Sequence, residues 1–166
     1  MNANLAFDFS VNKEKKAITV KREFDAALPL VWDAYTKKEL LDQWWAPKPW
    51  KAKTKSMDFR EGGQWLYAMV GPQGEVHWSF ANYQEIVNQQ KFIGLDGFSD
   101  EHGNVNASLP QSRWEVSFQS TGNKTLVTCH ITYNQLEDLE NIIKMGFKEG
   151  FTMALGNLDE VLATLK

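Results

Sequence analysis

From residue 50 to residue 134 the sequence is a series of short segments of alternating polarity, separated by tight turns. The turn sequences EGG at 61–63, GPQG at 71–74 and TGN at 121–123 are rich in glycine. The expected strands lie at residues 51–60, 64–70, 75–87, 91–98, 113–120 and 125–133. Because such short turns leave no room for a crossover, neighbouring strands must run antiparallel, as in a meander.

One more strand pattern and two helical patterns precede this series, and a longer helical pattern follows it. AITVKREF at 17–24 alternates like a half-buried strand, and LPLVWDAYTKKELLDQWW after it predicts two short helices, or one broken helix, ending before Pro47. Residues 134–166 keep large apolar side chains at helical spacing and predict one long helix. Along it Gly146, Gly150 and Ala154 fall four residues apart, and each glycine costs up to ~1 kcal/mol relative to alanine. Close approach to the sheet, or room for a ligand, would offset that cost.

The order of these elements predicts an α+β fold. We expect a curved antiparallel seven-stranded sheet, two short helices after the first strand, and a long C-terminal helix that packs on one face. A length of 166 residues suits one domain, which we place at residues 15–166. Residues 1–14 are polar and predict an N-terminal arm or an added edge strand. The polar segment 99–112 is longer than most hairpin loops, and such loops are often lids or mobile segments.

Composition argues against several classes of function. A formal net charge of -3 does not suit a nucleic-acid-binding protein, which needs a basic face. The local exception is Lys48, Lys51, Lys53 and Lys55, which predicts a solvated strand face, with an anionic partner site as the alternative. No segment approaches the ~18 apolar residues of a membrane span, and the N-terminus does not resemble a signal peptide. The single cysteine, Cys129, cannot form an internal disulfide, which suits the cytoplasm.

Four motifs together resemble one known family. They are PLVWDAYTKKELLDQWWAP at 29–47, MDFREGGQW at 57–65, NYQEIVNQQKF at 82–92 and KEGFTMALGNLDEVL at 148–162. In this order they resemble the first helical segment, the acidic-x-Arg-x-Gly-Gly signature, the paired strands and the helix end of AHSA-type proteins. These are relatives of the C-terminal domain of the activator of the 90-kDa heat-shock protein ATPase, within the START-like, or Bet v-like, superfamily. The family usually has Trp where this chain has Phe151, a change within the same apolar role.

The resemblance implies a helix-grip (START-like) fold, in which the sheet grips the C-terminal helix and a cavity lies between them. Superfamily members bind lipids, polyketides or other apolar small molecules, and some are cyclases or hydrolases. The heat-shock-protein activator carries a separate N-terminal domain that 166 residues are too few to contain. We therefore do not expect direct stimulation of that ATPase.

Alternation and helical spacing select the side chains that would line such a cavity. Expected ligand-binding residues are Trp45, Trp65, Tyr67, Met69, Trp78, Phe80, Trp114, Phe118, Phe147, Phe151 and Leu155. Polar candidates for the cavity are Asp58, Arg60 and His77. A plain packed core explains the same apolar stripe, since burial alone contributes ~1.5–3 kcal/mol for each large side chain. An ion pair between Asp58 and Arg60 that orders the adjacent turn explains the polar pair.

Residues capable of catalysis are scattered. His77 and His130 alternate with apolar neighbours and predict solvent-facing side chains, while His102 lies in the polar loop. Glu75 and His77 could share a strand face, but no second pair has metal-ligand spacing, so we expect no metal and no cofactor. Cys129 predicts a buried, unreactive thiol. No residue is assigned a catalytic role.

Three functions remain open from sequence. The first is binding of an apolar small molecule between sheet and helix. The second is an enzyme of hydrolase or cyclase type acting on an apolar substrate, with His77, Asp58, Arg60 or Glu61 as acid–base groups. The third is a chaperone accessory or stress-response protein that uses its outer surface, with a chaperone as partner. Exposed sheet edges would favour a homodimer.

The segment LLDQWWAPKPWK at 40–51 predicts a helix-to-strand corner. Adjacent residues on a helix point about 100° apart, so Trp44 and Trp45 cannot face the same space. One should fill the core, and the other should lie at the cavity mouth or the surface. Pro47 and Pro49 end the helix and extend the chain, and Trp50 anchors the start of the next strand.

Overall fold

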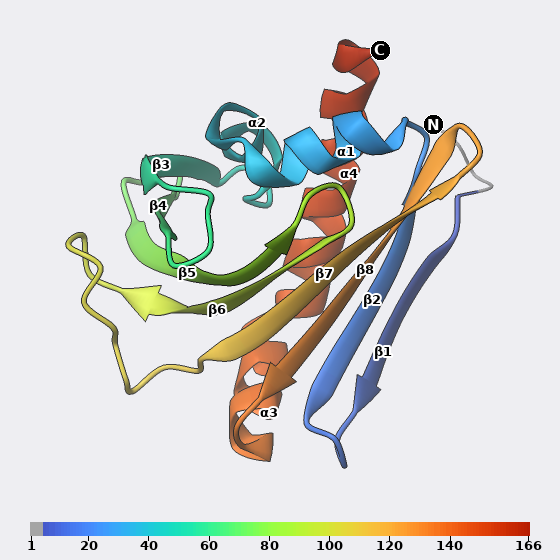
Figure 1. The fold of residues 1–166 in the computed structure, drawn as a ribbon. Helices are drawn as coiled ribbons and strands as arrows, with labels where there is room; N and C mark the ends of the chain where they lie inside the picture. The colour runs from blue at the N-terminus through green and yellow to red at the C-terminus, as the bar shows by residue number, and fades with distance from the viewer. Residues whose placement is uncertain (1–4) are drawn as a thin grey trace.

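A computed structural model describes residues 5–166 and contains one curved antiparallel sheet (Figure 1). Its strands are β1 (Phe7–Asn12), β2 (Ala17–Phe24), β3 (Lys51–Met57), β4 (Gln64–Val70), β5 (Val76–Val87), β6 (Lys91–Ser99), β7 (Ser112–Thr121) and β8 (Lys124–Tyr133). They follow the order β1-β2-β8-β7-β6-β5-β4-β3. The predicted meander is therefore confirmed from β3 to β8, and β2 pairs antiparallel with β8.

The sheet has eight strands where the sequence predicted seven. The additional strand is β1, which pairs antiparallel with β2 at one edge of the sheet. The alternative of an added edge strand within residues 1–14 is therefore confirmed, and Phe7, Phe9 and Val11 alternate along β1 with polar residues, although most of its side chains are exposed. Of the expected arm at residues 1–14, residues 1–4 lie outside the described residues.

Four helices complete the described chain: α1 (Leu28–Thr36), α2 (Lys38–Trp44), α3 (Leu136–Lys144) and α4 (Phe147–Leu165). The expectation of one continuous helix over 134–166 is wrong at Gly146, which has a φ of 90°. The Gly146 amide donates to the carbonyl of Ile143, so this glycine ends α3 in the left-handed conformation typical of helix C-termini. Gly146 thus belongs to a turn, and Gly150 and Ala154 alone lie on the helix face.

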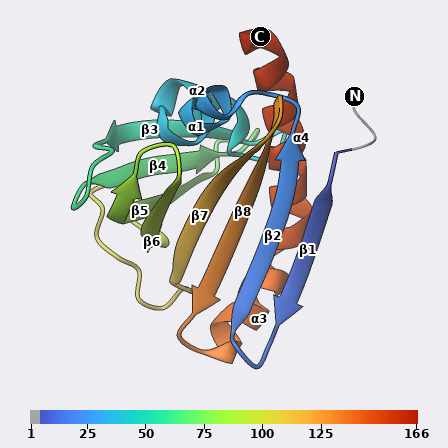
Figure 2. The ribbon, with the colours of Figure 1, turned by 45° about the vertical axis from the view of Figure 1, so that its right-hand side comes forward.

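Helix α4 crosses one face of the sheet, and α1 and α2 pack beside it at one end of the strands (Figures 1 and 2). The most deeply buried side chains between these layers include Trp44, Phe24 and Leu158, which have no more than 2% of their surface exposed. Burial of each such side chain stabilises the fold by ~1.5–3 kcal/mol. This inner face of the sheet, toward α4, carries the core at one end and the site described below at the other.

The helix-to-strand corner separates its two tryptophans as expected. Trp44 is fully buried, and its indole N–H donates to the carbonyl of Ala34 at 2.9 Å. Trp45 is half-buried and donates to the hydroxyl of Tyr67 on β4 at 3.0 Å. Trp50 stacks on His77 at 5.5 Å and so joins the corner to β5. The indole groups of Trp44 and Trp45 are thus held by hydrogen bonds that fix their ring orientation.

The predicted lysine face of β3 is solvent-exposed. Lys51, Lys53 and Lys55 are exposed, and β3 is the last strand of the sheet. Lysines on an edge strand hinder pairing with a strand from another molecule. The interpretation of these lysines as a solvated strand face therefore accounts for their position.

Candidate functional site

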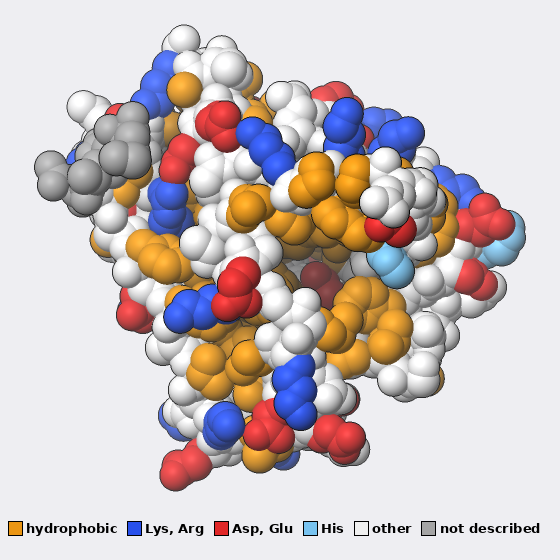
Figure 3. All heavy atoms as spheres, turned by 180° about the vertical axis from the view of Figure 1, so that it is seen from behind, with side chains coloured by type: hydrophobic (Ala, Val, Ile, Leu, Met, Phe, Trp, Pro, Cys, Tyr) orange, Lys and Arg blue, Asp and Glu red, His pale blue; other side chains and the backbone are white. Residues whose placement is uncertain are grey.

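A cavity of about 260 Å³ lies between the inner face of the sheet and the region where α3 meets α4. Seen from the helix side, the surface is hollowed here, with hydrophobic side chains around the hollow, an acidic side chain inside it and a histidine at its edge (Figure 3). An engineered cavity of ~150 Å³ in another protein holds benzene. The space is therefore large enough for a molecule with two fused rings.

Aromatic rings from both layers form most of the cavity wall. Trp45 follows α2, Tyr67 and Trp114 come from the sheet, and Phe147 and Phe151 come from the first turns of α4. Phe147 and Phe151 stack at 5.3 Å, and Trp114 meets Phe151 edge-on at 5.6 Å. The remaining apolar lining is Pro47, Met69, Phe80, Phe98, Pro110, Ile142 and Met145.

Hydroxyl groups hold two of these rings in place. The indole N–H of Trp114 donates to Ser112 at 3.1 Å, as that of Trp45 does to Tyr67. Both acceptors stand on the inner face of the sheet beside the cavity. Because each tryptophan is anchored at its polar atom, its ring is set before any ligand arrives.

Asp96 of β6 is the one carboxylate in the cavity lining, and no lysine or arginine lines the cavity in the described chain. Its side chain points to the inner face, in register with Ser112 on β7 and Ala81 on β5. The residue retains some accessible surface because it faces the cavity, yet it lies deep among apolar groups. Burial raises the pKa of Asp96 to about 8. Among residues 5–166 no group donates a hydrogen bond to this carboxyl.

Further hydroxyls surround Asp96 on the neighbouring strands. Ser112 and Tyr133 stand in the same cross-strand row, and Tyr67 and Ser79 form the next row toward the open side. Burial, reinforced by the nearby Asp96, raises the pKa of Tyr67 and of Tyr133 above the ordinary tyrosine range. These hydroxyls therefore stay protonated at physiological pH, and the floor of the cavity offers uncharged donors and acceptors around one acid.

Eight of the predicted side chains border the cavity and six do not. Bordering it are Trp45, Tyr67, Met69, His77, Phe80, Trp114, Phe147 and Phe151. Away from it are Trp65, Trp78, Phe118, Leu155, Asp58 and Arg60. Trp65, Phe118 and Leu155 belong to the packed core next to the cavity, where Phe118 meets Trp32 edge-on at 5.0 Å.

The expected inner face of β5 is inverted. Register with β4 pairs His77 with Met69 and Ser79 with Tyr67, so the polar residues of this segment face the cavity. Trp78 therefore faces the outer side, whereas Phe80 borders the cavity together with its cross-strand neighbour Gly97. His77 is exposed, as the sequence predicted, but it lies at the edge of the cavity. Lys55 lies 5.8 Å above the Trp78 ring on the outer side.

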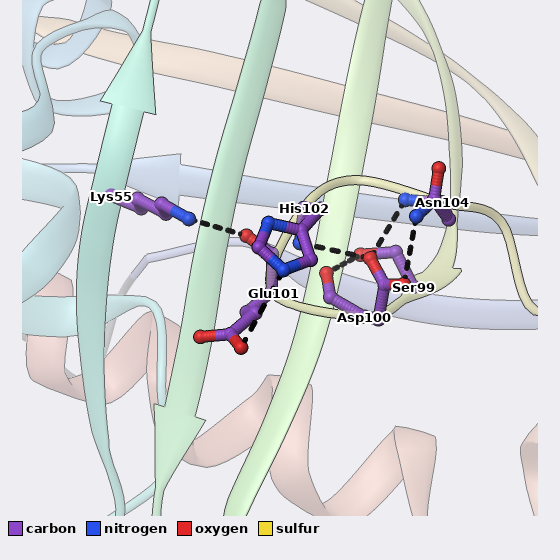
Figure 4. A network of polar contacts seen from close by, with 6 residues as sticks. All are labelled: Lys55, Ser99, Asp100, Glu101, His102 and Asn104. Atoms are coloured by element: carbon purple, nitrogen blue, oxygen red, sulfur yellow. Dashed lines mark hydrogen bonds and ion pairs between the residues drawn. The ribbon is translucent and has the colours of Figure 1, made fainter.

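The polar loop after β6 explains this inversion. Asp100 accepts hydrogen bonds from the backbone N–H groups of His102 and Asn104 at 2.8 and 2.9 Å, and Lys55 donates to the carbonyl of Glu101 (Figure 4). A Cβ at Gly103 would lie 3.9 Å from the side chain of Leu66, on the outer face. The loop thus covers the outer side of β4 and β5 and buries apolar residues there, while its end supplies Pro110 to the cavity.

Asp58 and Arg60 form the turn between β3 and β4, and they do not reach the cavity. Their side chains are joined at 2.6 Å and are largely exposed, as the ion-pair interpretation expects. A Cβ on Gly63 would lie 2.0 Å from the Asp58 carbonyl oxygen, so the second glycine of the turn is required by backbone contact. Glu61 accepts a hydrogen bond from the Ile86 backbone and orders the same turn.

The acid–base inventory of the site is short. Asp96 has a pKa close to physiological pH, whereas burial raises the pKa of the Cys129 thiol to about 12 and leaves it unreactive. Within residues 5–166 no group of histidine, cysteine and carboxylate side chains could hold a metal ion. No helix of that described part is long and apolar enough to cross a membrane. The site thus supplies apolar contact and one buried acid.

Asp96 was missed by the sequence analysis, although a signal was present. In KFIGLDGF the residues Phe92, Gly94 and Asp96 share one strand face, and Phe92 is buried. A charged residue in phase with a buried aromatic is rare unless it is paired, so this aspartate marked a site. Ser79, Ser112 and Tyr133 gave no comparable signal, because hydroxyl residues are common on both faces of strands.

Comparison with known proteins agrees with the fold. A protein of Mycobacterium smegmatis is 27% identical with a TM-score of 0.88, and the alignment covers 98% of this chain and 99% of that one. A protein of Arthrobacter aurescens is 28% identical with a TM-score of 0.89, covering 95% and 91%. A protein of Staphylococcus epidermidis is 28% identical with a TM-score of 0.82, covering 95% of both chains. No functionally curated protein matches the chain.

A family model described as "Activator of Hsp90 ATPase homolog 1-like protein" matches residues 25–163. The match begins at the loop before α1 and ends in the last turn of α4, so it contains every residue that lines the cavity. The resemblance inferred from the four sequence motifs is confirmed by this match and by the helix-grip architecture. The chain belongs to the family of activator of Hsp90 ATPase homolog 1-like proteins.

Proposed function

We propose that this protein binds an apolar small molecule in the cavity between the sheet and helix α4. The observation that supports this most directly is the aromatic cavity of about 260 Å³, which the surrounding side chains leave unfilled. Packed protein interiors contain few voids larger than a water molecule. Ligand sites are typically concave, mostly apolar and equipped with a few polar groups, as this one is.

In this proposal the predicted apolar residues that border the cavity form its wall, and Asp96 provides a polar contact for the ligand. Trp45 and Trp114 supply large rigid surfaces, because their hydrogen bonds to hydroxyls fix the ring planes. Met69 and Met145 are flexible and polarisable, which suits contact with an irregular ligand. His77 stands at the exposed edge, where it can contact a polar end of the ligand.

Gly150 provides a way to test this proposal. It borders the cavity, and a Cβ at this position would meet only Pro47, at an ordinary 3.6 Å. The substitution Gly150→Leu therefore places four carbon atoms in or beside the cavity without a backbone clash. Gly156, two turns later in α4, has open space around its Cβ position and does not border the cavity. Gly156→Leu is the matched control, with the same gain in helix propensity.

The experiment combines native mass spectrometry of freshly purified protein with calorimetric titration of a neutral two-ring probe, 2-naphthol. We expect Gly150→Leu to weaken 2-naphthol binding by at least about tenfold, or ~1.4 kcal/mol, and to lose any copurifying compound. The Gly156→Leu protein should bind as the parent does. Equal binding by both variants, or no binding by the parent chain, would contradict the proposed function.

A further inference from the structure

We infer that the cavity is a site for a protonated amine carried on an aromatic body, with the carboxylate of Asp96 as its counter-ion. This inference rests on the proposed function and names the class of ligand. It is carried by three features of the cavity: the sign of its charge, the chemistry of its wall and its volume.

Charge complementarity selects the ligand's polar group. The lining contains one acidic side chain and no lysine or arginine, so a fatty acid or another anion would meet only a carboxylate. Asp96 accepts no hydrogen bond from any group in the described part of the chain. An ammonium group brings donors as well as the missing positive charge, and charge-assisted hydrogen bonds are about twice as strong as neutral ones.

The wall favours a cation for a second reason. Trp45, Tyr67 and Trp114 border the same space as Asp96, together with the stacked pair Phe147 and Phe151. Aromatic faces attract cations within ~6 Å of the ring centroid, and tryptophan does so most strongly. A carboxylate at the floor and several rings around it are the two elements with which proteins recognise ammonium groups.

Volume selects the body of the ligand. A space of about 260 Å³ exceeds the ~150 Å³ that encloses benzene in an apolar cavity. One or two fused rings with a short aminoalkyl chain therefore fit. Tryptamine and phenethylamine represent this class, and tryptophol and indole-3-propionate replace the ammonium of tryptamine by a hydroxyl and a carboxylate.

Ionisation of Asp96 links amine binding to pH. In the free protein burial raises the pKa of Asp96 to about 8, so at pH 7 the amine must displace a proton from the carboxyl, which weakens binding about tenfold. The other titratable side chains around this space are Tyr67 on β4, His77 and Tyr83 on β5, and Cys129 and Tyr133 on β8. Helices α3 and α4 contribute only apolar residues and glycines to the lining.

The same effect gives the expected pH profile. Burial keeps the tyrosines and Cys129 protonated throughout the range from pH 6 to pH 9. His77 stands at the exposed edge of the same space, so His77→Gln serves as the control for this side chain. Tryptamine affinity should therefore rise about tenfold from pH 6 to pH 7 and level off above pH 8, both in the parent chain and in His77→Gln.

The test is isothermal titration of the four probes into the whole chain at pH 6, 7 and 9, and into Asp96→Asn. We expect tryptamine to bind at least tenfold more tightly than tryptophol at pH 9, with indole-3-propionate weakest. Asp96→Asn should remove this preference and the pH dependence, while tryptophol affinity stays within threefold. In the parent chain tryptamine binding should release a proton at pH 7, which titrations in two buffers of different ionisation enthalpy measure directly.

The outcomes separate the two proposals. Equal or tighter binding of tryptophol overturns the amine assignment and leaves the proposed function standing, with Asp96 as a neutral hydrogen-bond donor. A preference for tryptamine that persists in Asp96→Asn also overturns it, since the cation would then be held elsewhere. If neither amine binds, the assignment fails, and binding of 2-naphthol decides whether the proposed function fails with it.

Discussion

Asp96 should make the folded protein less stable as the pH rises, and replacing it by asparagine should remove that penalty. The ordinary pKa of the carboxyl, 3.8, describes the unfolded chain, and burial raises it to about 8 in the folded chain. The folded state therefore binds this proton more tightly than the unfolded state does. Stability is fully retained below pH 3.8, falls as the pH rises, and reaches its lower limit above pH 8.

The size of the effect follows from the separation of the two pKa values. One pKa unit corresponds to ~1.4 kcal/mol, so ionisation of Asp96 lowers the free energy of unfolding by about 2 kcal/mol at pH 5, about 4 at pH 7 and about 6 at pH 9. Asparagine has nearly the same shape as the protonated acid and carries no charge. Asp96→Asn should therefore be more stable than the parent chain by these amounts.

Urea unfolding of both proteins at the three pH values measures the difference. Asp100→Asn is the control: hydrogen bonds from Asn104 lower the pKa of this exposed carboxyl below its ordinary 3.8, so its contribution to stability is lost only below that pH. The stability difference between the parent and Asp100→Asn should therefore stay constant from pH 5 to pH 9. A stability difference between the parent and Asp96→Asn that stays constant from pH 5 to pH 9 would refute the reasoning. It would mean that Asp96 is ionised in the folded protein at the same pH as in the unfolded chain.

Three further substitutions test the local structure of the fold. Gly146→Ala should lower the free energy of unfolding by ~1–2 kcal/mol, because an L-residue at a φ of 90° is strained. Gly150→Ala, in the interior of α4, should raise the free energy of unfolding by up to ~1 kcal/mol. Chemical denaturation of the two variants measures this difference between a turn glycine and a helix glycine. Tyr35→Phe should stabilise the protein by ~1 kcal/mol, because the Tyr35 hydroxyl is buried with no hydrogen-bond partner in the described chain, and a loss of stability on thermal denaturation would contradict this.

The fold could be predicted from sequence because periodicity and turn chemistry act locally. Apolar and polar residues alternate in the segments between the turns, and this pattern predicts strands β3 to β8. The spacing of apolar residues before Pro47 predicts α1 and α2. The number of strands was predicted one too low because residues 1–14 were predicted as an arm or an added edge strand, although Phe7, Phe9 and Val11 alternate with polar residues. The break in the C-terminal helix was missed because Gly146 leaves the apolar spacing intact while its backbone ends α3.

The site was harder to predict, because its geometry depends on contacts between distant parts of the chain. From the sequence Trp78 resembles an inner residue, but in the structure it lies on the outer face, where the loop after β6 packs. The orientation of β5 is thus decided by a segment some twenty residues later in the chain. Asp96 could have been found from its phase with Phe92, but its burial depends on rings from the helices, which no strand pattern reveals.

Two features that lower stability meet in the same cavity, and they come from different elements. The buried carboxyl of Asp96 on β6 costs stability at physiological pH, and Gly150 costs up to ~1 kcal/mol in the interior of α4. Each cost could be removed by one substitution, Asp96→Asn or Gly150→Ala, that the surrounding structure accommodates without a backbone clash. Destabilising residues that persist together at one place are typical of functional sites, where activity and stability conflict. Asp96 keeps a titratable acid in the cavity and Gly150 keeps the space open above it, so the two costs have one explanation if a ligand occupies the space.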